Sequence, residues 1–443
     1  MGKLKVLIAN ALFHPFSGGV EKHTLELAAA MARQGVEVHV ITGRLAGTKE
    51  EETLRGIRVH RIPCTELRIP RYYPPPMIVA PGFYRSLQEL DAKHDFDVIH
   101  LQDRWFPDFN LAIAYAKRAC KPNIVTLHNA RPVGIAPHYT LVGGLYDSLV
   151  GKRVLRKADY IISVSKWAAG DIGHYGIPRS KITVIRNGID AKVFKPGSGK
   201  SFRRKHGITG RMLLFVGRVI RQKGLDYLVA AMPEILCATP DTKLVIIGRG
   251  NRLEHVRKRV KKLGLENNVV FPGFVNEREL KAALRECDAF VLPSLWEVLP
   301  VSILEAMASG KPIVCTDAGG NRELVQNGFN GFVVPKRDPK ALAHAVARVL
   351  RDEKLRKKMG RNSRRKAVAE FSWNRIAALT IDLYRNAVAG CKRAPTTNGT
   401  AALARLSQEL SHRKLKFENY LESFETQWKK LFKTSLDQRG RLE

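Results

Sequence analysis

Short runs rich in apolar residues alternate with amphipathic stretches along most of the chain. The runs are typical of buried strands, and the stretches between several of them repeat their apolar positions with the period of a helix. In the first half the expected strands are Val6–Ala9, Val36–Thr42, Val98–Leu101, Ile124–Leu127 and Ile161–Val164. The expected helices include Glu21–Gln34 and Leu111–Ala119. This alternation predicts a parallel sheet covered by helices.

The same alternation starts again after Asn187-Gly188. The expected strands of this second series are Leu213–Val216, Leu244–Ile247, Val269–Phe271, Phe290–Leu292 and Ile313–Cys315. The expected helices are Leu225–Leu236, Leu253–Leu263, Glu277–Glu286 and Val301–Ser309. Pro, Gly and Ser gather at Lys195–Ser201, which predicts a linker. We therefore expect two doubly wound α/β domains that bind their ligands at the carboxyl ends of the strands.

The last stretch of the chain differs from the rest. Ala394–Thr400 is a polar break, and Ala401–Lys433 then carries apolar residues at helical intervals among many charges. This pattern predicts an appended amphipathic helix or helix pair. Such a helix either docks on the body or on a partner chain, which allows an oligomer, or lies in a membrane interface.

Charge changes the picture, because Lys and Arg number 75 against 41 for Asp and Glu, a formal net charge of +34. Such a field attracts polyanions. The basic residues cluster at 152–157, 257–262 and 351–366. Three explanations stay open: a generally basic or hot cellular setting, an anionic membrane surface, and nucleic acid. Nucleic acid is the least favoured, since the sequence has no helix-turn-helix, zinc-finger or aromatic RNA-reading signature.

Six cysteines stand at long spacings, without a CxxC pair or a Cys/His cluster, so we expect mostly buried free thiols in a reducing compartment and no metal. The N-terminus runs straight into a strand without the apolar region of a signal peptide. No apolar run approaches the ~18 residues of a membrane span. The expected location is cytoplasmic, with the protein lying on the inner membrane face if it meets a membrane.

Two carboxylates eight residues apart flank the start of a helix. Glu297 lies in the loop after the apolar strand that ends at Pro293-Ser294, and Glu305 lies on the helix. Carboxylates accept hydrogen bonds from sugar hydroxyls, and the helix start offers backbone N–H groups to a phosphate. By itself the pair is a weak signal, because exposed glutamates at this spacing also arise by chance.

Two cations, Arg218 and Lys223, stand five residues apart in the strand-to-helix loop after Leu213–Val216. At that place they can clamp a diphosphate, although a solvated basic loop explains the same residues. Gly18-Gly19 follows the first strand, where glycines let a ligand approach the backbone. His128 ends the strand Ile124–Leu127, a position at which a histidine is often only structural.

The sequence around these residues strengthens their interpretation as functional residues. The segments around Glu297 and Glu305, together with Gly310-Lys311-Pro312, Ala318-Gly319-Gly320-Asn321 and Asn330-Gly331-Phe332, resemble glycosyltransferase family 4. That family includes sucrose synthases, bacterial mannosyltransferases and the catalytic subunit for glycosylphosphatidylinositol assembly. The residue after the first glutamate is often Gly in the family and is Val298 here, which we interpret as a specificity difference. The resemblance covers roughly residues 3–390.

The resemblance implies the GT-B fold and a role for each motif. Glu297 is implied to contact the donor sugar and Glu305 the ribose hydroxyls, while Arg218 and Lys223 hold the pyrophosphate. His128 is implied to position the sugar. The further donor-binding residues that the resemblance implies are Gly18, Gly19, Val275, Leu299 and Val301. The Gly-Gly-Val-Glu-x-His form of the first loop looks especially like the branch that acts on phosphatidylinositol.

The resemblance also implies a reaction. It implies a retaining transfer from a nucleotide-diphosphate sugar by same-face attack, in which the leaving phosphate takes the acceptor proton. Catalysis then rests on positioning and on stabilisation of the diphosphate, with no cofactor and no essential metal. Asp95 and Asp97 mimic the metal-binding Asp-x-Asp triplet of the other large transferase fold. They precede the strand Val98–Leu101 and should lie at its amino end, away from the ligands.

The sequence thus predicts two doubly wound, Rossmann-like domains of the GT-B class facing across a cleft. We expect an acceptor-binding domain over residues 1–188, a nucleotide-sugar domain over 189–375, a helix returning to the first domain over 376–393 and an amphipathic extension over 394–443. The expected activity is transfer of a hexose or N-acetylhexosamine to a lipid-linked or glycan acceptor. Two alternatives stay open: a synthase acting on a soluble acceptor, and a non-catalytic polyanion-binding protein on the same scaffold.

Overall fold

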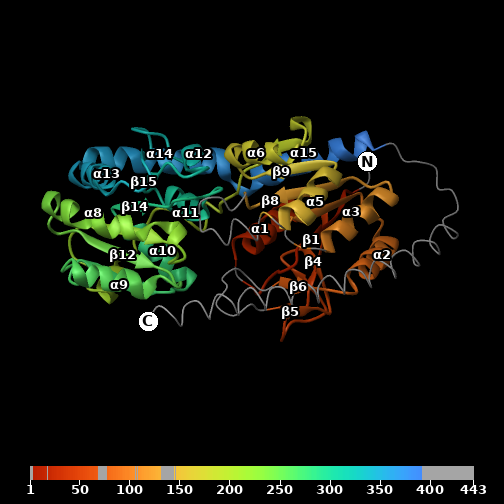
Figure 1. Cartoon of the computed structure of the whole chain (residues 1–443), viewed down its shortest axis with the longest axis horizontal. Coiled ribbons are helices and arrows are strands. Elements are labelled where there is room, and N and C mark those ends of the chain that lie inside the picture. Colours follow the sequence, from red (N-terminus) through yellow and green to blue (C-terminus); the bar gives the residue numbers. More distant parts are fainter. Residues whose placement is uncertain are drawn as a thin grey trace, which may run out of the picture. The chain divides into compact units, whose positions relative to one another are not determined.

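A computed structural model describes residues 3–16, 18–67, 77–104, 106, 108–130, 144 and 146–391. The predicted extension at 394–443 lies outside the described residues. Two largely parallel sheets dominate the described part, each made from one half of the chain (Figure 1). This arrangement confirms the α/β architecture of two Rossmann-like domains that the sequence predicts.

The first sheet has eight strands in the order β10-β9-β8-β7-β1-β2-β4-β3. Their bounds are β1 Lys5–Ala9, β2 Glu37–Gly43, β3 Glu51–Leu54, β4 Ile57–Ile62, β7 Val98–Gln102, β8 Asn123–Leu127, β9 Tyr160–Ser163 and β10 Ile182–Val184. Strand β1 pairs in parallel with β2 on one side and with β7 on the other. The strand order reverses between β1 and β7, so the loops after these two strands diverge and leave room for a ligand.

Alternate residues of the first sheet pack on opposite faces and belong to two separate hydrophobic layers. Val6 and Ile8 pack on the face covered by α1 (Gly19–Arg33) and α15 (Trp373–Gly390). Leu7 and Ala9 belong to the opposite layer. The helices of that layer are α2 (Phe83–His94), α3 (Asp108–Arg118) and α5 (Lys152–Lys157). Both faces are therefore covered, which explains why these strands read as continuous apolar runs.

The second sheet has six strands in the order β13-β12-β11-β14-β15-β16, and all of its pairs are parallel. The strand bounds are β11 Met212–Val216, β12 Lys243–Ile247, β13 Val269–Gly273, β14 Ala289–Leu292, β15 Ile313–Thr316 and β16 Gly331–Val334. The helices are α7 Lys200–Lys205, α8 Leu225–Ala238, α9 Leu253–Lys262, α10 Glu277–Glu286, α11 Val301–Ala308, α12 Asn321–Leu324, α13 Pro339–Arg351 and α14 Glu353–Phe371. Its strand order reverses between β11 and β14, and the carboxyl ends of strands at such a reversal are where sheets of this class usually bind ligands.

The chain leaves the first sheet and returns to it at one junction. Ile189 donates its backbone N–H to the carbonyl oxygen of Phe371 at 2.7 Å, so the outgoing segment and the end of α14 run side by side. A Cβ on Gly188 would lie 2.4 Å from the ring of Trp373, which explains the glycine there. Helix α15 then packs against α1, although the two lie far apart in the sequence (Figure 1).

The structure also differs from the sequence-based expectations in local features. The predicted linker Lys195–Ser201 runs into α7 and packs against α10, where Gly199 donates its backbone N–H to Glu286 at 2.6 Å. Strand β3 pairs antiparallel with β4, and a separate hairpin joins β5 (Thr65–Leu67) to β6 (Met77–Val79). The six cysteines are free, but only Cys287 and Cys315 are buried, and Cys237 is exposed.

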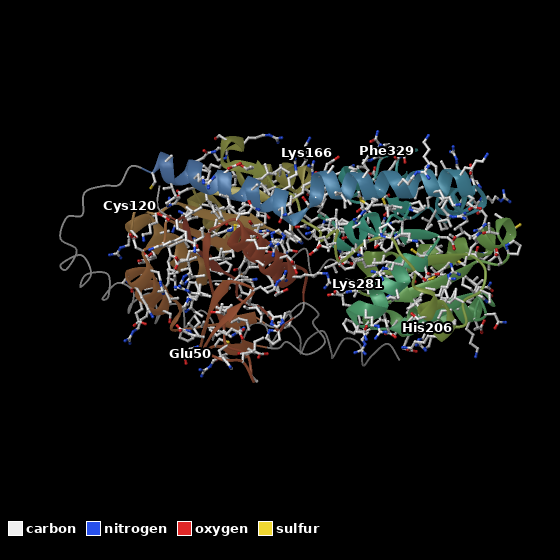
Figure 2. All side chains as sticks on the ribbon, turned by 180° about the vertical axis from the view of Figure 1, so that it is seen from behind. Glu50, Cys120, Lys166, His206, Lys281 and Phe329 are labelled. Atoms are coloured by element: carbon white, nitrogen blue, oxygen red, sulfur yellow. The ribbon has the colours of Figure 1, made fainter. Side chains whose placement is uncertain are left out.

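Basic side chains project from several helices of the described chain, among them Lys166 at the start of α6 (Lys166–Ile172) (Figure 2). Some members of the basic cluster at 351–366 instead serve the fold. The guanidinium of Arg364 donates to the backbone carbonyls of Ala191, Phe194 and Ala308 at 2.7–2.8 Å. In the part of the chain that the structure describes, no helix combines the length and the apolar character needed to cross a bilayer.

Candidate functional site

The loop between β11 and α8 brings a lysine to the edge of the second sheet. Gly224 has φ +65°, and a Cβ there would lie 2.1 Å from the carbonyl oxygen of Pro293. Gly248 similarly touches Gly217, where a Cβ would come within 1.9 Å of the carbonyl oxygen. Both contacts exclude side chains and let the loop pack tightly against its neighbours. Lys223 is thereby held beside the loop that follows β14.

Glu297 is the partner of that lysine. Its Oε1 lies 2.5 Å from Nζ of Lys223 and accepts a hydrogen bond from Oγ of Ser294 at 2.6 Å. The Glu297 side chain is 7% exposed and that of Lys223 13%, so water screens the pair little. The carboxylate is therefore fixed in direction by two donors, and its remaining oxygen can accept hydrogen bonds from a ligand hydroxyl.

Two glycines pack closely against the backbone next to Glu297. Gly320 donates its N–H to the carbonyl oxygen of Glu297 at 3.3 Å, and Gly319 has φ +56°. A Cβ on Gly319 would lie 1.8 Å from the same oxygen, and one on Gly320 would lie 2.0 Å from the carbonyl oxygen of Val298. The Gly-Gly pair after β15 thus sets the position of the loop before α11. Helix α11 begins at Val301, and its first N–H groups lack carbonyl partners within the helix, which suits an anion.

Glu305, on α11, faces a residue of the first half of the chain. Its Oε1 lies 2.8 Å from Nζ of Lys22 on α1, and the Lys22 ammonium also lies 5.1 Å from the ring centre of Phe194. Burial lowers the pKa of Lys22, but the charge of Glu305 and its hydrogen bond outweigh burial, so the pKa stays above its usual value. The sequence analysis missed Lys22 as a site residue, although it lies in the quoted Gly-Gly-Val-Glu-x-His segment.

His128 ends a chain of polar side chains that crosses the first sheet. Its Nε2–H donates to Oε1 of Gln102 at 2.8 Å. The Gln102 amide nitrogen lies 3.4 Å from Nε2 of His100, and Nδ1 of His100 lies 2.6 Å from the hydroxyl of Tyr384 on α15. Burial and the neighbouring His23 and His100 lower the pKa of His128 well below its usual value, so the ring is neutral. The other nitrogen, Nδ1, is then an acceptor.

Two acids with raised pKa values lie near the carboxyl ends of β1 and β7. Burial raises the pKa of Glu21 to about 7, against the hydrogen bond from its own backbone N–H. Burial also raises the pKa of Asp103 to about 6, although Arg104 stands beside it. Glu21 folds back over the start of α1, where a Cβ on Gly18 would lie 2.2 Å from its Oε2. Carboxyl groups that titrate near neutral pH are typical of functional sites.

A buried ion pair supports this edge of the first sheet. Arg104 donates to both carboxylate oxygens of Asp147 at 2.8 and 3.0 Å and to the carbonyl oxygen of Asn129 at 2.8 Å. The Tyr175 hydroxyl donates to the same Asp147 carboxylate. The pair holds the segment after β7 against the segment after β8, which places Asp103 and His128 on adjacent loops.

The remaining predicted residues take separate places. Arg218 is exposed on the same loop as Lys223, and Gly18 and Gly19 form the start of α1. Leu299 is buried in the loop before α11, and Val301 is the first residue of that helix. Val275 is partly buried in the turn between β13 and α10. The second sheet thus contributes a lysine, two carboxylates and a helix start, a set that suits a diphosphate and sugar hydroxyls.

The Asp95–Asp97 triplet lies where the sequence places it. Asp97 accepts a hydrogen bond from the backbone N–H of Lys5, the first residue of β1, at 2.8 Å. Asp95 is the C-cap of α2 and lies 2.9 Å from Nζ of Lys121. Both carboxylates therefore stand at the amino ends of the strands, away from the loops described above.

Two protein families match the chain. The family described as Glycosyltransferase Family 4 matches residues 17–193, and the family described as Glycosyl transferases group 1 matches residues 199–366. The division between the two matches falls at the junction of the two sheets. Together they cover the loops that carry Lys22, His128, Lys223, Glu297 and Glu305.

The similarity to individual relatives covers nearly the whole length of each relative. An uncharacterised glycosyltransferase of Methanocaldococcus jannaschii is 32% identical, over 84% of this chain and 95% of its own length. The glycogen synthase of Mycobacterium tuberculosis is 30% identical, over 84% of this chain and 92% of its own.

Solved structures share the fold. A sucrose-phosphate synthase of Thermosynechococcus elongatus superimposes with a TM-score of 0.72 at 23% identity, over 87% of this chain and all of its own. The Anabaena protein HepE, solved in complex with UDP-glucose, superimposes with a TM-score of 0.66 at 21% identity, over 86% of this chain and 100% of its own.

Proposed function

Because the chain belongs to the group 1 and family 4 glycosyltransferases, we propose that it transfers a hexose or N-acetylhexosamine from a nucleotide-diphosphate sugar to a lipid-linked or glycan acceptor. The observation that carries the donor half of the proposal is the set formed by Lys223, Glu297 and the start of α11. A cation and open helix N–H groups suit a diphosphate, and the adjacent carboxylate suits the hydroxyls of the sugar. HepE, with the same fold, binds UDP-glucose.

The roles within the donor site follow from what each side chain touches. Lys223 and the exposed Arg218 neutralise the leaving diphosphate, and Glu305 accepts hydrogen bonds from the ribose. Glu297 is already bound by Lys223 and Ser294, which supports a role in orienting the donor sugar. His128, neutral and anchored on Gln102, offers Nδ1 to a sugar hydroxyl. The remaining donor contacts are Gly18, Gly19, Val275, Leu299 and Val301.

The reaction proceeds with retention of the anomeric configuration. The acceptor hydroxyl attacks from the face that the diphosphate leaves, and the leaving phosphate oxygen takes the acceptor proton. Glu297 and Glu305 are both paired with lysines, which favours orienting roles over attack on the donor sugar. Catalysis then depends on positioning and on the electrostatic stabilisation of the diphosphate.

For the acceptor, the basic surface favours a lipid-linked substrate on an anionic membrane. Arg257, Lys258 and Arg259 on α9 are exposed, and further exposed basic residues lie on α14. Such clusters hold a protein at an anionic bilayer through electrostatic attraction. The proposal includes two further points: the protein acts at the cytoplasmic face of the membrane, and it is related to the branch that acts on phosphatidylinositol. A soluble or polymeric acceptor is the second candidate, favoured by the likeness to a glycogen synthase.

A two-step experiment tests the donor and the acceptor separately. The full chain is first screened by thermal shift against nucleoside diphosphates and their sugars, where a stabilising pair identifies base and sugar. Radiolabelled donor of that identity is then offered with a membrane lipid extract, with glucans or with simple sugars. Transfer to lipid, together with co-sedimentation with anionic vesicles at low salt, supports the lipid acceptor.

The outcomes separate the candidates. Transfer to glucan or sugar without vesicle binding supports a soluble or polymeric acceptor. Inversion of the anomeric centre, read by proton NMR of the product, rejects the retaining mechanism. The absence of any stabilising nucleotide rejects the donor assignment itself.

A further inference from the structure

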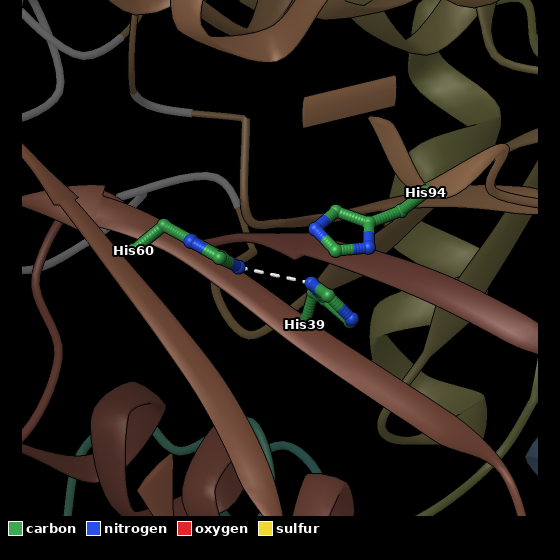
Figure 3. Close-up of side chains that lie close together, drawn as sticks. All are labelled: His39, His60 and His94. Atoms are coloured by element: carbon green, nitrogen blue, oxygen red, sulfur yellow. Dashed lines mark hydrogen bonds between the residues drawn. The ribbon is translucent and has the colours of Figure 1, made fainter. Parts of the chain in front are cut away.

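Three histidines far from the candidate transfer site converge in the first sheet. His39 lies on β2, His60 on β4, and His94 is the last residue of α2 (Figure 3). One ring nitrogen from each can be chosen so that all three lie within 4.8 Å of one another. His39 and His60 are buried and His94 is partly exposed. The sequence gives no sign of this group, because the three residues stand in unrelated segments.

Two carboxylates fix which ring nitrogens carry hydrogen. Nε2 of His39 lies 3.2 Å from Oε1 of Glu37, and Nδ1 of His60 lies 3.0 Å from Oε1 of Glu51. An ionised carboxylate has no hydrogen to donate and only accepts hydrogen bonds. The hydrogen of each neutral ring therefore sits on the nitrogen that faces its glutamate.

The opposite nitrogens of the same two rings face each other. Nδ1 of His39 lies 2.9 Å from Nε2 of His60 (Figure 3). With both hydrogens turned toward the glutamates, two lone pairs point at one another at hydrogen-bond distance. Such an arrangement is repulsive unless a cation lies between the nitrogens. Both rings are buried, and burial disfavours the extra charge of a protonated imidazole.

We propose that His39, His60 and His94 bind one divalent first-row transition-metal ion, with zinc the best fit. Imidazole nitrogens are ligands that zinc favours, and a ring nitrogen bonded to a carboxylate on its far side is the usual second-sphere arrangement of zinc histidines. Tetrahedral coordination at about 2.0 Å places two ligand nitrogens roughly 3.3 Å apart, a small opening from the observed contact. Water can take the fourth position from the partly exposed side of His94.

The place of the site indicates a structural role. His39 lies near the amino end of β2 and packs against Phe96, just before β7. The loops that carry His128 and Glu21 follow the opposite, carboxyl ends of the strands. An ion there would tie β2 and β4 to the end of α2, near the outer edge of the sheet. The proposal is independent of the transfer reaction and of its donor.

The test uses the full chain without an affinity tag, stripped of metal by a chelator. Zn²⁺ is titrated against a chromophoric competitor, and melting temperature is followed in parallel. Co²⁺ serves as a spectroscopic probe, because histidine nitrogens and cysteine thiolates give different absorption bands. Cys237→Ser removes the exposed thiol as a competing ligand. We expect one equivalent of Zn²⁺, a raised melting temperature and a Co²⁺ spectrum without thiolate bands.

Variants distinguish the cluster from adventitious binding. His94→Ala, at a partly exposed position that the fold tolerates, should weaken Zn²⁺ binding at least tenfold. Glu51→Gln keeps every ligand but weakens the orienting hydrogen bond, so a loss of about tenfold is expected. His255→Ala is the matched control, because His255 lies on α9 and pairs with Asp226. It should leave zinc affinity unchanged.

Two results would overturn the proposal. One is zinc affinity that is equal in the wild type and in His94→Ala. The other is no zinc uptake together with a proton shared between His39 and His60, detected by nitrogen-15 NMR of the imidazoles. In that second case a trapped proton supplies the cation between the rings.

Discussion

The ammonium of Lys22 on α1 lies 2.8 Å from the carboxylate of Glu305 on α11, two residues that are 283 positions apart in the sequence. The two helices pack against different sheets, so the pair joins the two halves of the chain at the candidate donor site. Glu305 is 8% exposed and Lys22 42%, which leaves the ammonium within reach of solvent. A ribose that binds Glu305 must therefore displace Lys22 or share the carboxylate with it.

The first prediction concerns this competition. Lys22→Met should bind the nucleoside diphosphate of the donor up to about fivefold more tightly, because a partly exposed ion pair contributes about 0–1 kcal/mol. The measurement is isothermal titration calorimetry with the nucleotide found by thermal shift. Lys340→Met, an exposed lysine on α13, is the control. A weaker affinity in Lys22→Met would mean that Lys22 itself contacts the nucleotide.

The second prediction separates the two glutamates of the donor site. Glu297→Ala should weaken binding of the nucleotide sugar at least tenfold more than binding of the nucleoside diphosphate, because Glu297 is proposed to meet the sugar and bears on the diphosphate only through Lys223. Glu305→Ala should weaken both ligands by a similar factor, because the ribose is common to them. Calorimetry with both ligands on both variants gives the four values. Equal losses on both ligands in Glu297→Ala would contradict the assignment.

The third prediction follows from the raised pKa of Glu21, about 7 against its usual value of 4.5. The folded state holds this carboxyl neutral up to about pH 7, so the protein loses stability as pH rises from 4.5 to 7 and stays lower above. Each pKa unit corresponds to about 1.4 kcal/mol, so the loss is on the order of 3 kcal/mol. Glu21→Gln should therefore melt higher than the wild type at pH 8 and nearly equal to it at pH 5.

Thermal unfolding at the two pH values checks this sign. Glu266→Gln, at an exposed position, is the control and should change neither melting temperature by more than a degree or so. A Glu21→Gln variant that gains equally at both pH values would show that the carboxyl is ionised throughout.

The fourth prediction concerns Arg104 and Asp147. Arg104→Met leaves the buried Asp147 carboxylate with the Tyr175 hydroxyl as its remaining side-chain partner among the described residues, which should cost about 3–5 kcal/mol. Adding Asp147→Asn removes the stranded charge, so the double variant should be more stable than the single one. Arg85→Met, which breaks the exposed pair with Glu89, should cost less than about 1 kcal/mol. Unfolding by urea, followed by circular dichroism, ranks the three.

Sequence patterns located most of the fold because the strands are buried on both faces. The predicted helix Glu277–Glu286 has the observed bounds of α10, and the first predicted strand of the second sheet differs from β11 by one residue. Short strands such as β10 and β16 were not predicted, because a few residues carry too little pattern. The antiparallel pairing of β3 was also beyond the sequence, since pairing partners depend on contacts between segments rather than on either segment alone.

Which charged side chains meet in the site could not be predicted from the sequence. Glu297, Lys223 and Glu305 stand in loops and at a helix start that their own segments predict, but their partners Ser294 and Lys22 emerged only from the folded chain. The raised pKa of Glu21 depends on burial by surrounding segments, which no local pattern encodes.

By itself, then, the sequence determined the two α/β halves, because hydrophobic periodicity is a local property that each segment carries wherever it lies. Tertiary structure alone decided the pairing of Lys22 with Glu305. It also decided the close contact of Gly319 and Gly320 with the Glu297 loop. The same holds for the cluster of His39, His60 and His94. Charge pairs, close backbone approaches and histidine clusters all depend on distances across the fold, and such distances are set only when the segments pack together.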